Sequence, residues 1–123
     1  MKFKKTINTL LVATSLLSVQ AFANNSIFPE GHISKIDTWV YGSDEYGVWV
    51  TLAAGATDTG DCGNTYYLPH TSDNKQLVYS ALLSAQVSQT RVRLQSTTDS
   101  AAKNKLGMCR ASRVTLCHDT SCN

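Results

Sequence analysis

Residues 72–96, SDNKQLVYSALLSAQVSQTRVRLQS, decide the predicted fold because they carry a sustained helical period followed at once by a strand pattern. Asp73 with Gln76 three residues later has the form of a capping box, so we expect a helix from Asp73 to Gln89. Residues 90–95 alternate polar and apolar side chains, which is the period-two pattern of a half-buried strand. The sequence therefore predicts a helix that leads directly into a strand.

The predicted helix has two apolar sides. At about 100° per residue, five side chains share one face that should cover the domain's own core. They are Leu77, Val78, Ala81, Leu82 and Ala85. A second line, Tyr79, Leu83 and Val87, runs along another side. Soluble monomers seldom leave such a line bare, so we expect it to be covered, either by a neighbouring subunit in a ring-forming homo-oligomer or by the loop of residues 97–107.

The first 23 residues have the pattern of a secretory signal peptide. Three lysines precede an apolar run over residues 10–19, and the small-residue tripeptide Ala21-Phe22-Ala23 follows. The run is too short and too interrupted by hydroxyl side chains to favour a membrane anchor, and no later stretch is apolar enough to span a bilayer. We therefore expect a protein that is secreted or periplasmic, with one domain over residues 24–123.

Without that signal, 100 residues remain, with eight Lys and Arg against nine Asp and Glu. A nucleic-acid-binding protein is expected to concentrate positive charge, which this balance disfavours. A domain of this size has a modest core, so disulfides or oligomerisation would help to stabilise it.

Four cysteines, an even number in an exported chain, predict two disulfides. Of the three possible pairings, the short spacing of Cys117 and Cys122 favours a bond between them, which leaves Cys62 with Cys109. The long bond would contribute about 4 kcal/mol in the chain-entropy relation. A metal site that uses His118 is the alternative, but the cysteines lack paired zinc-ligand spacing, and we expect no metal and no cofactor.

Alternation and turn residues predict five strands. They cover residues 32–41, 46–52, 65–68, 90–95 and 108–117. The helix falls between the third strand and the fourth, which is the order of an OB-fold, so we expect a mainly β domain with one helix, built as a small five-stranded OB-like barrel. An open α+β sheet with the helix on one face is the alternative.

The sequence carries no motif that supports catalysis, so we expect a protein that is not an enzyme. Asp58 and Asp61 could bind a cation or act as an acid/base pair, but two carboxylates in a loop are more often a solvated turn. The candidate ligand-binding residues are aromatic: Trp49, Tyr66 and Tyr67. The alternative for each of them is packing within a sheet, since neighbouring strand residues point to opposite faces.

Two stretches carry a resemblance to a known family: the helix VYSALLSAQVSQ running into TRVRLQ, and the end of the chain, VTLCHDTSC. With the signal peptide, they resemble the B subunits of pertussis-like AB5 toxins, the subtilase cytotoxin and typhoid toxin group. The resemblance implies OB-fold subunits that assemble as homopentamers, with the helices around a central pore. It also implies a glycan receptor and a catalytic toxin subunit as partners.

The chain departs from that family in two places. Where the family has a serine that helps to hold sialic acid, this chain reads Phe28-Pro29-Glu30-Gly31, and the Glu30 carboxylate is expected to repel an anionic sugar. The family's early hairpin disulfide has no counterpart near Cys62. No binding residue is therefore carried over. We expect an exported, non-enzymatic binding module for a cell-surface glycan or partner protein, and the alternative is a monomeric periplasmic structural or inhibitor protein that acts through its loops.

Overall fold

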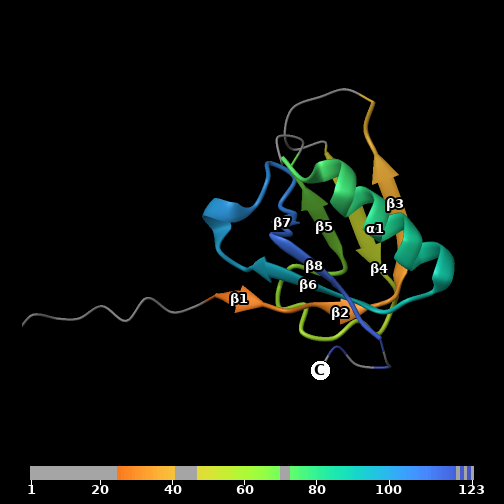
Figure 1. The fold of residues 1–123 in the computed structure, drawn as a ribbon. Helices are drawn as coiled ribbons and strands as arrows, with labels where there is room; N and C mark the ends of the chain where they lie inside the picture. The colour runs from red at the N-terminus through yellow and green to blue at the C-terminus, as the bar shows by residue number, and fades with distance from the viewer. Residues whose placement is uncertain (1–24, 41–46, 70–72, 119, 121, 123) are drawn as a thin grey trace, which may run out of the picture.

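The structure is a computed structural model that describes residues 25–40, 47–69, 73–118, 120 and 122. Its elements, in chain order, are β1 (Ser26–Ile27), β2 (Glu30–Gly31), β3 (Ile33–Thr38), β4 (Val48–Leu52), β5 (Thr65–Leu68), α1 (Lys75–Ser88), β6 (Val92–Thr97), the 3-10 helix η2 (Ser100–Ala102), β7 (Cys109–Arg110) and β8 (Arg113–Leu116). The described part is mainly β with one α-helix, which confirms the predicted class (Figure 1). The predicted signal peptide lies outside the described residues.

The strands form two sheets. The first has the order β3-β4-β5-β7, in which β5 and β7 run parallel and the other pairs are antiparallel. In the second, β6 pairs with β1, β2 and β8, always antiparallel. Both sheets are open over the described residues, so closure into one barrel is not observed.

β1 and β2 hold the same register against β6 although Phe28 and Pro29 separate them. The Pro29 carbonyl accepts a hydrogen bond from the Leu94 N–H at 2.8 Å. Proline has no N–H to return that bond, so the ladder is interrupted here without a loss of register. The two short strands are therefore one extended segment with a proline in it.

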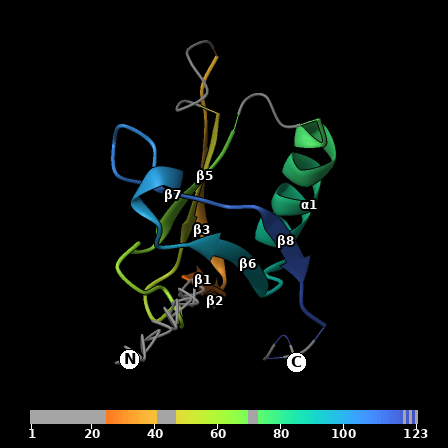
Figure 2. The ribbon, with the colours of Figure 1, turned by 90° about the vertical axis from the view of Figure 1, so that its left-hand side faces the viewer.

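Two short connections carry the chain from one sheet to the other. His32 alone separates β2 in the second sheet from β3 in the first. Residues 111–112 separate β7 in the first sheet from β8 in the second. Figure 2 shows the helix α1 on one side of the strands.

The helix begins later than the sequence predicts. Its N-cap is Asn74, whose side chain makes no capping hydrogen bond, so the predicted capping box of Asp73 and Gln76 is wrong. Gln76 is the second helical residue and not the third, and it cannot reach back as a capping-box side chain does. At the other end Gln89 is left-handed, with φ 54°, and its N–H donates to the last turn, which ends the helix as a C-cap does.

The core face of α1 is close to the predicted one. Leu82 and Ala85 are fully buried and Val78 is partly buried against the core, where the helix contacts β3 and β8. Leu77, however, is 72 % exposed, so its assignment to the core face is wrong. It lies more than a quarter of a turn from the centre of the buried face, because that face is centred on Leu82 and Ala85.

The core lies between the two sheets and the helix. In β6 the buried and half-buried residues alternate strictly, which confirms the strand that the sequence predicted after the helix. Its inward apolar residues, Val92 and Leu94, meet apolar residues of the first sheet. Those that are fully or almost fully buried include Val50, Leu52 and Tyr66.

Candidate functional site

A cleft of about 200 Å³ lies between the first turns of α1 and the ends of β3, β4 and β5. Trp39 and Tyr79 give it aromatic walls, while Thr38, Lys75 and Gln76 add polar groups. Tyr79 belongs to the second apolar line of the helix, and Trp39 directly follows β3. The fold thus brings two aromatic side chains that are far apart in the sequence to one hollow.

Trp39 is supported by a second tryptophan. The ring centroids of Trp39 and Trp49 are 5.1 Å apart and their planes are tilted by 59°. The pairing of β3 with β4 places Asp37 opposite Trp49, so Trp39 lies diagonally across from it on the same face. Trp39 is 48 % exposed, an unusual exposure for so large an apolar side chain. Its indole is therefore held in place and open to solvent.

The three aromatic residues that the sequence suggested as ligand-binding candidates are half-buried or buried. Trp49 is half-buried beneath Trp39. Tyr66 is fully buried and its hydroxyl donates to the Gly63 carbonyl at 2.9 Å, so it has no surface to offer a ligand. Burial raises the pKa of the Tyr66 hydroxyl, and the Asp58 carboxylate adds to the rise. Tyr67 is 8 % exposed, with its hydroxyl against the Ala102 carbonyl.

None of the three sequence-based ligand-binding candidates lines the cleft, and Trp39 is the aromatic lining residue that the sequence analysis omitted. A signal for it exists, because Trp39 and Trp49 flank the turn residues between two predicted strands, and a hairpin brings such flanking residues together. Periodicity alone placed Trp39 inside a strand and gave no reason to single it out.

The second apolar line of the helix is only partly covered. Tyr79 is half-buried at the cleft, whereas Leu83 is 37 % and Val87 85 % exposed. The alternative in which residues 97–107 fold over this line is wrong. That segment contacts the first sheet and its loop, through the Ala102 carbonyl and through Lys103, whose ammonium lies 3.4 Å from a carboxylate oxygen of Asp61.

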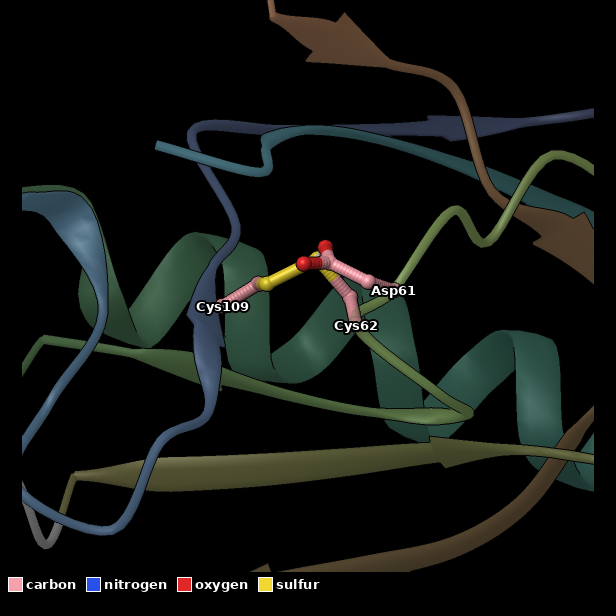
Figure 3. A group of neighbouring side chains, drawn as sticks. All are labelled: Asp61, Cys62 and Cys109. Carbon is pink, nitrogen blue, oxygen red and sulfur yellow. Dashed lines mark hydrogen bonds between the residues drawn. A yellow bond between two sulfur atoms is a disulfide. The ribbon is translucent and has the colours of Figure 1, made fainter. Parts of the chain in front are cut away.

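Both predicted disulfides are confirmed. Cys62 is bonded to Cys109 and Cys117 to Cys122, with Cα atoms 5.6 and 4.7 Å apart. Asp61 lies beside the first bond, with a carboxylate oxygen 4.0 Å from the Cys62 sulfur (Figure 3). Sulfurs joined to each other offer no thiolate to a cation, so the group of Asp61, Cys62 and Cys109 is a structural tie.

Glu30, expected to repel anions, is instead neutralised within the fold. One carboxylate oxygen accepts from Arg91 Nε at 2.8 Å and from the Cys122 N–H at 3.2 Å, and the other accepts from Arg93 Nη2 at 3.0 Å. The hydrogen bond from Arg91 lowers the pKa of the Glu30 carboxyl below its ordinary 4.5, and the Arg93 and Cys122 bonds add to this against the opposing effect of burial. Two guanidinium groups therefore surround one carboxylate, and the expected repulsion of an anionic sugar stays a prediction.

In comparisons with known proteins, no family model, no curated protein and no solved structure matches the chain. Across the described ranges, no helix is both long enough and apolar enough to cross a membrane. The two disulfides are consistent with an oxidising location outside the cytoplasm.

Proposed function

We propose that the chain is an exported, non-enzymatic binding module whose cleft holds a sugar residue of a cell-surface glycan. The observation that carries the proposal is the exposed indole of Trp39, held by Trp49 beside the polar groups of Thr38 and Gln76. A pyranose ring has an apolar face of C–H groups and a rim of hydroxyls. It can lie on an indole while its hydroxyls bond to nearby polar side chains.

Binding is better supported than catalysis by the chemistry of the cleft. Among the described residues that line it, the Lys75 ammonium and the Tyr79 hydroxyl can exchange a proton, but none is a carboxylate, a histidine or a thiol. General acid/base and nucleophilic catalysis depend chiefly on such groups. A cleft with an aromatic wall, an amide and a hydroxyl is suited to the binding of a ligand.

An OB-like arrangement, as in the toxin B subunits that the sequence resembles, is part of the proposal. Its support is a circuit of neighbouring strands: β3, β4, β5 and β7, then β8, β6 and β2, and back to β3. The circuit passes between the sheets at residues 111–112 and at His32. Five bent strands in a partly open barrel give such a circuit.

Assembly into a ring, with a pentamer as the expected form, is the second part of the proposal. Its support is the exposure of Leu83 and Val87 on one side of α1. A second copy that packs against this side would remove the exposed line from water, which contributes favourably in proportion to the apolar area. A catalytic toxin subunit is the partner that the resemblance implies for such a ring.

The cleft is tested by Trp39→Ala, with Val40→Ala as the matched control because Val40 is the next residue and is 98 % exposed. Labelled mature protein is applied to a printed array of neutral and sialylated cell-surface glycans. We expect the native protein and Val40→Ala to bind the same glycans and Trp39→Ala to lose at least tenfold in affinity. A native protein that binds no glycan on the array, or a Trp39→Ala variant that binds as well as the native one, would contradict the proposal.

A further inference from the structure

The second sheet carries basic side chains on its outward face. Residues of β6 that point away from the core pair with outward residues of the neighbouring strands: Arg93 lies between Glu30 and Thr115, and Gln95 lies opposite Arg113. Arg91 precedes β6 on the same side, where its guanidinium reaches Glu30. We call this surface the arginine face; it comprises Arg91, Arg93, Gln95, Arg113 and Thr115.

The arginine face has an excess of positive charge. Glu30 is the carboxylate that contacts it, and that carboxylate is already occupied by Arg91, Arg93 and the Cys122 N–H. Arg91 donates its Nε–H to this carboxylate, and its side chain remains 22 % exposed. Arg113 is exposed and forms no ion pair with any residue that the structure describes. Among the described residues, three guanidinium groups therefore belong to this face, and Glu30 is the carboxylate that two of them contact.

An aromatic ring borders this charge. The register of β1 and β2 against β6 continues through Pro29, which places Phe28 opposite Gln95, with Arg113 on the other side of the same row. Phe28 is 39 % exposed, and its N–H donates to an Asp58 carboxylate oxygen at 2.7 Å, which fixes the backbone beneath the ring. The face thus combines a flat apolar group with guanidinium and amide donors.

We infer that the arginine face binds a sulfated polysaccharide. A sulfate ester stays ionised and presents several acceptor oxygens, which suit the planar fork of donors on arginine. The Phe28 ring offers an apolar surface to a sugar ring next to that fork. The open sheet face allows a polymer to cross both β6 and β8, so more than one sulfate can meet a guanidinium. This surface lies on a different sheet from the Trp39 cleft.

Two other polyanions fit the same surface less well. Nucleic-acid binding relies on a basic stripe that neutralises several successive phosphates, whereas over residues 24–123 acidic side chains outnumber basic ones by nine to eight. An acidic polypeptide would satisfy the guanidinium groups but has no ring to stack on Phe28 at each repeat. It is therefore kept as an outcome of the test.

The test titrates the mature protein with a heparin octasaccharide, with the same octasaccharide after chemical desulfation, and with poly-glutamate of similar charge. Binding is followed by calorimetry at low salt and then over a salt series. We expect binding of the sulfated octasaccharide, with affinity falling as salt rises because counterions are released. We expect at least tenfold weaker binding of the desulfated octasaccharide and of poly-glutamate.

The variants locate the site. Arg113→Gln is expected to weaken octasaccharide binding at least fivefold and Phe28→Ala about threefold, while Arg110→Gln, an exposed arginine on β7 of the other sheet, changes it less than twofold. Circular dichroism of each variant checks that it is folded. Equal effects of Arg113→Gln and Arg110→Gln, or equal affinity for the desulfated octasaccharide, would overturn the inference. Equally tight binding of poly-glutamate would overturn the choice of a polysaccharide.

Discussion

The two disulfides are expected to stabilise the protein unequally, and double Cys→Ala variants test this. Cys62 and Cys109 are separated by 47 positions and Cys117 and Cys122 by 5. In the chain-entropy relation, closing the longer loop contributes about 4 kcal/mol to the free energy of unfolding and the shorter about 2 kcal/mol. Cys109 is also fully buried, so its replacement removes packing contacts that add to the loss.

The assay is urea denaturation at 25 °C, followed by circular dichroism, for the native protein, Cys62→Ala/Cys109→Ala and Cys117→Ala/Cys122→Ala. All three are measured at one protein concentration, because assembly would make stability depend on concentration. We expect a loss of about 4 kcal/mol or more for the long bond and about 2 kcal/mol for the short one. The slope of the free energy of unfolding against urea concentration should be steepest in the variant without the long bond, because its denatured chain is the most expanded.

A variant lacking the short bond that is destabilised as much as the variant lacking the long bond would refute this reasoning. Stability would then depend on what the C-terminal loop contacts and not on the length of chain that each bond closes. The Cys122 N–H bond to Glu30 is the contact that such a result would identify.

Three further predictions follow from the packing and the charges. Leu82→Ala should lower the free energy of unfolding by about 3 kcal/mol and Leu77→Ala by less than about 0.5 kcal/mol, because Leu82 is fully buried and Leu77 is 72 % exposed; equal losses in urea denaturation would contradict the observed orientation of α1. Leu83→Asp should convert the mature protein from an oligomer into folded monomers in light scattering, and a native protein that already has the mass of one subunit at micromolar concentration would end the ring proposal. Glu30→Gln should destabilise the protein by about 2 kcal/mol at pH 7, since a charge-assisted network is lost. Because the folded pKa of Glu30 lies below its ordinary 4.5, its contribution is present above that pH and lost as pH falls through the folded pKa, so the acid loss of stability should be shallower in Glu30→Gln; identical pH profiles would exclude Glu30 as its source.

Local patterns of the sequence account for much of the fold. The alternation of residues 90–95 predicted β6 because side chains of a strand point alternately to its two faces, and one face here meets the core. Spacing of the cysteines predicted both disulfides, because a short separation is easily closed and leaves a single remaining pair. The strand and the short disulfide depend on residues that are near one another in the chain, and the long disulfide follows from the number of cysteines that remain.

Tertiary contacts decided the features that local patterns predicted wrongly or omitted. Leu77 has a suitable residue type and spacing for the core, but the position of α1 against β3 and β8 leaves it exposed. Trp39 became a candidate through its contact with Trp49 across a strand pair, and the periodicity of its own strand gives no sign of that contact.

The charge of Glu30 is a second case in which tertiary contacts decided what the sequence could not predict. From the sequence it is a carboxylate expected to repel anions, and the structure surrounds it with Arg91, 61 positions away, and with Arg93. The ionisation and partners of a side chain depend on groups that only folding brings within a few ångströms, because electrostatic interactions act through space and not along the chain. The sequence by itself therefore determined the helix, several of the strands, the disulfide pairing and the mainly β class of fold. The predicted order of five strands is wrong: it omits β1 and β2, and residues 108–117 form two strands, β7 and β8, in different sheets. The tertiary structure alone decided which faces are open and which charges remain available to a ligand.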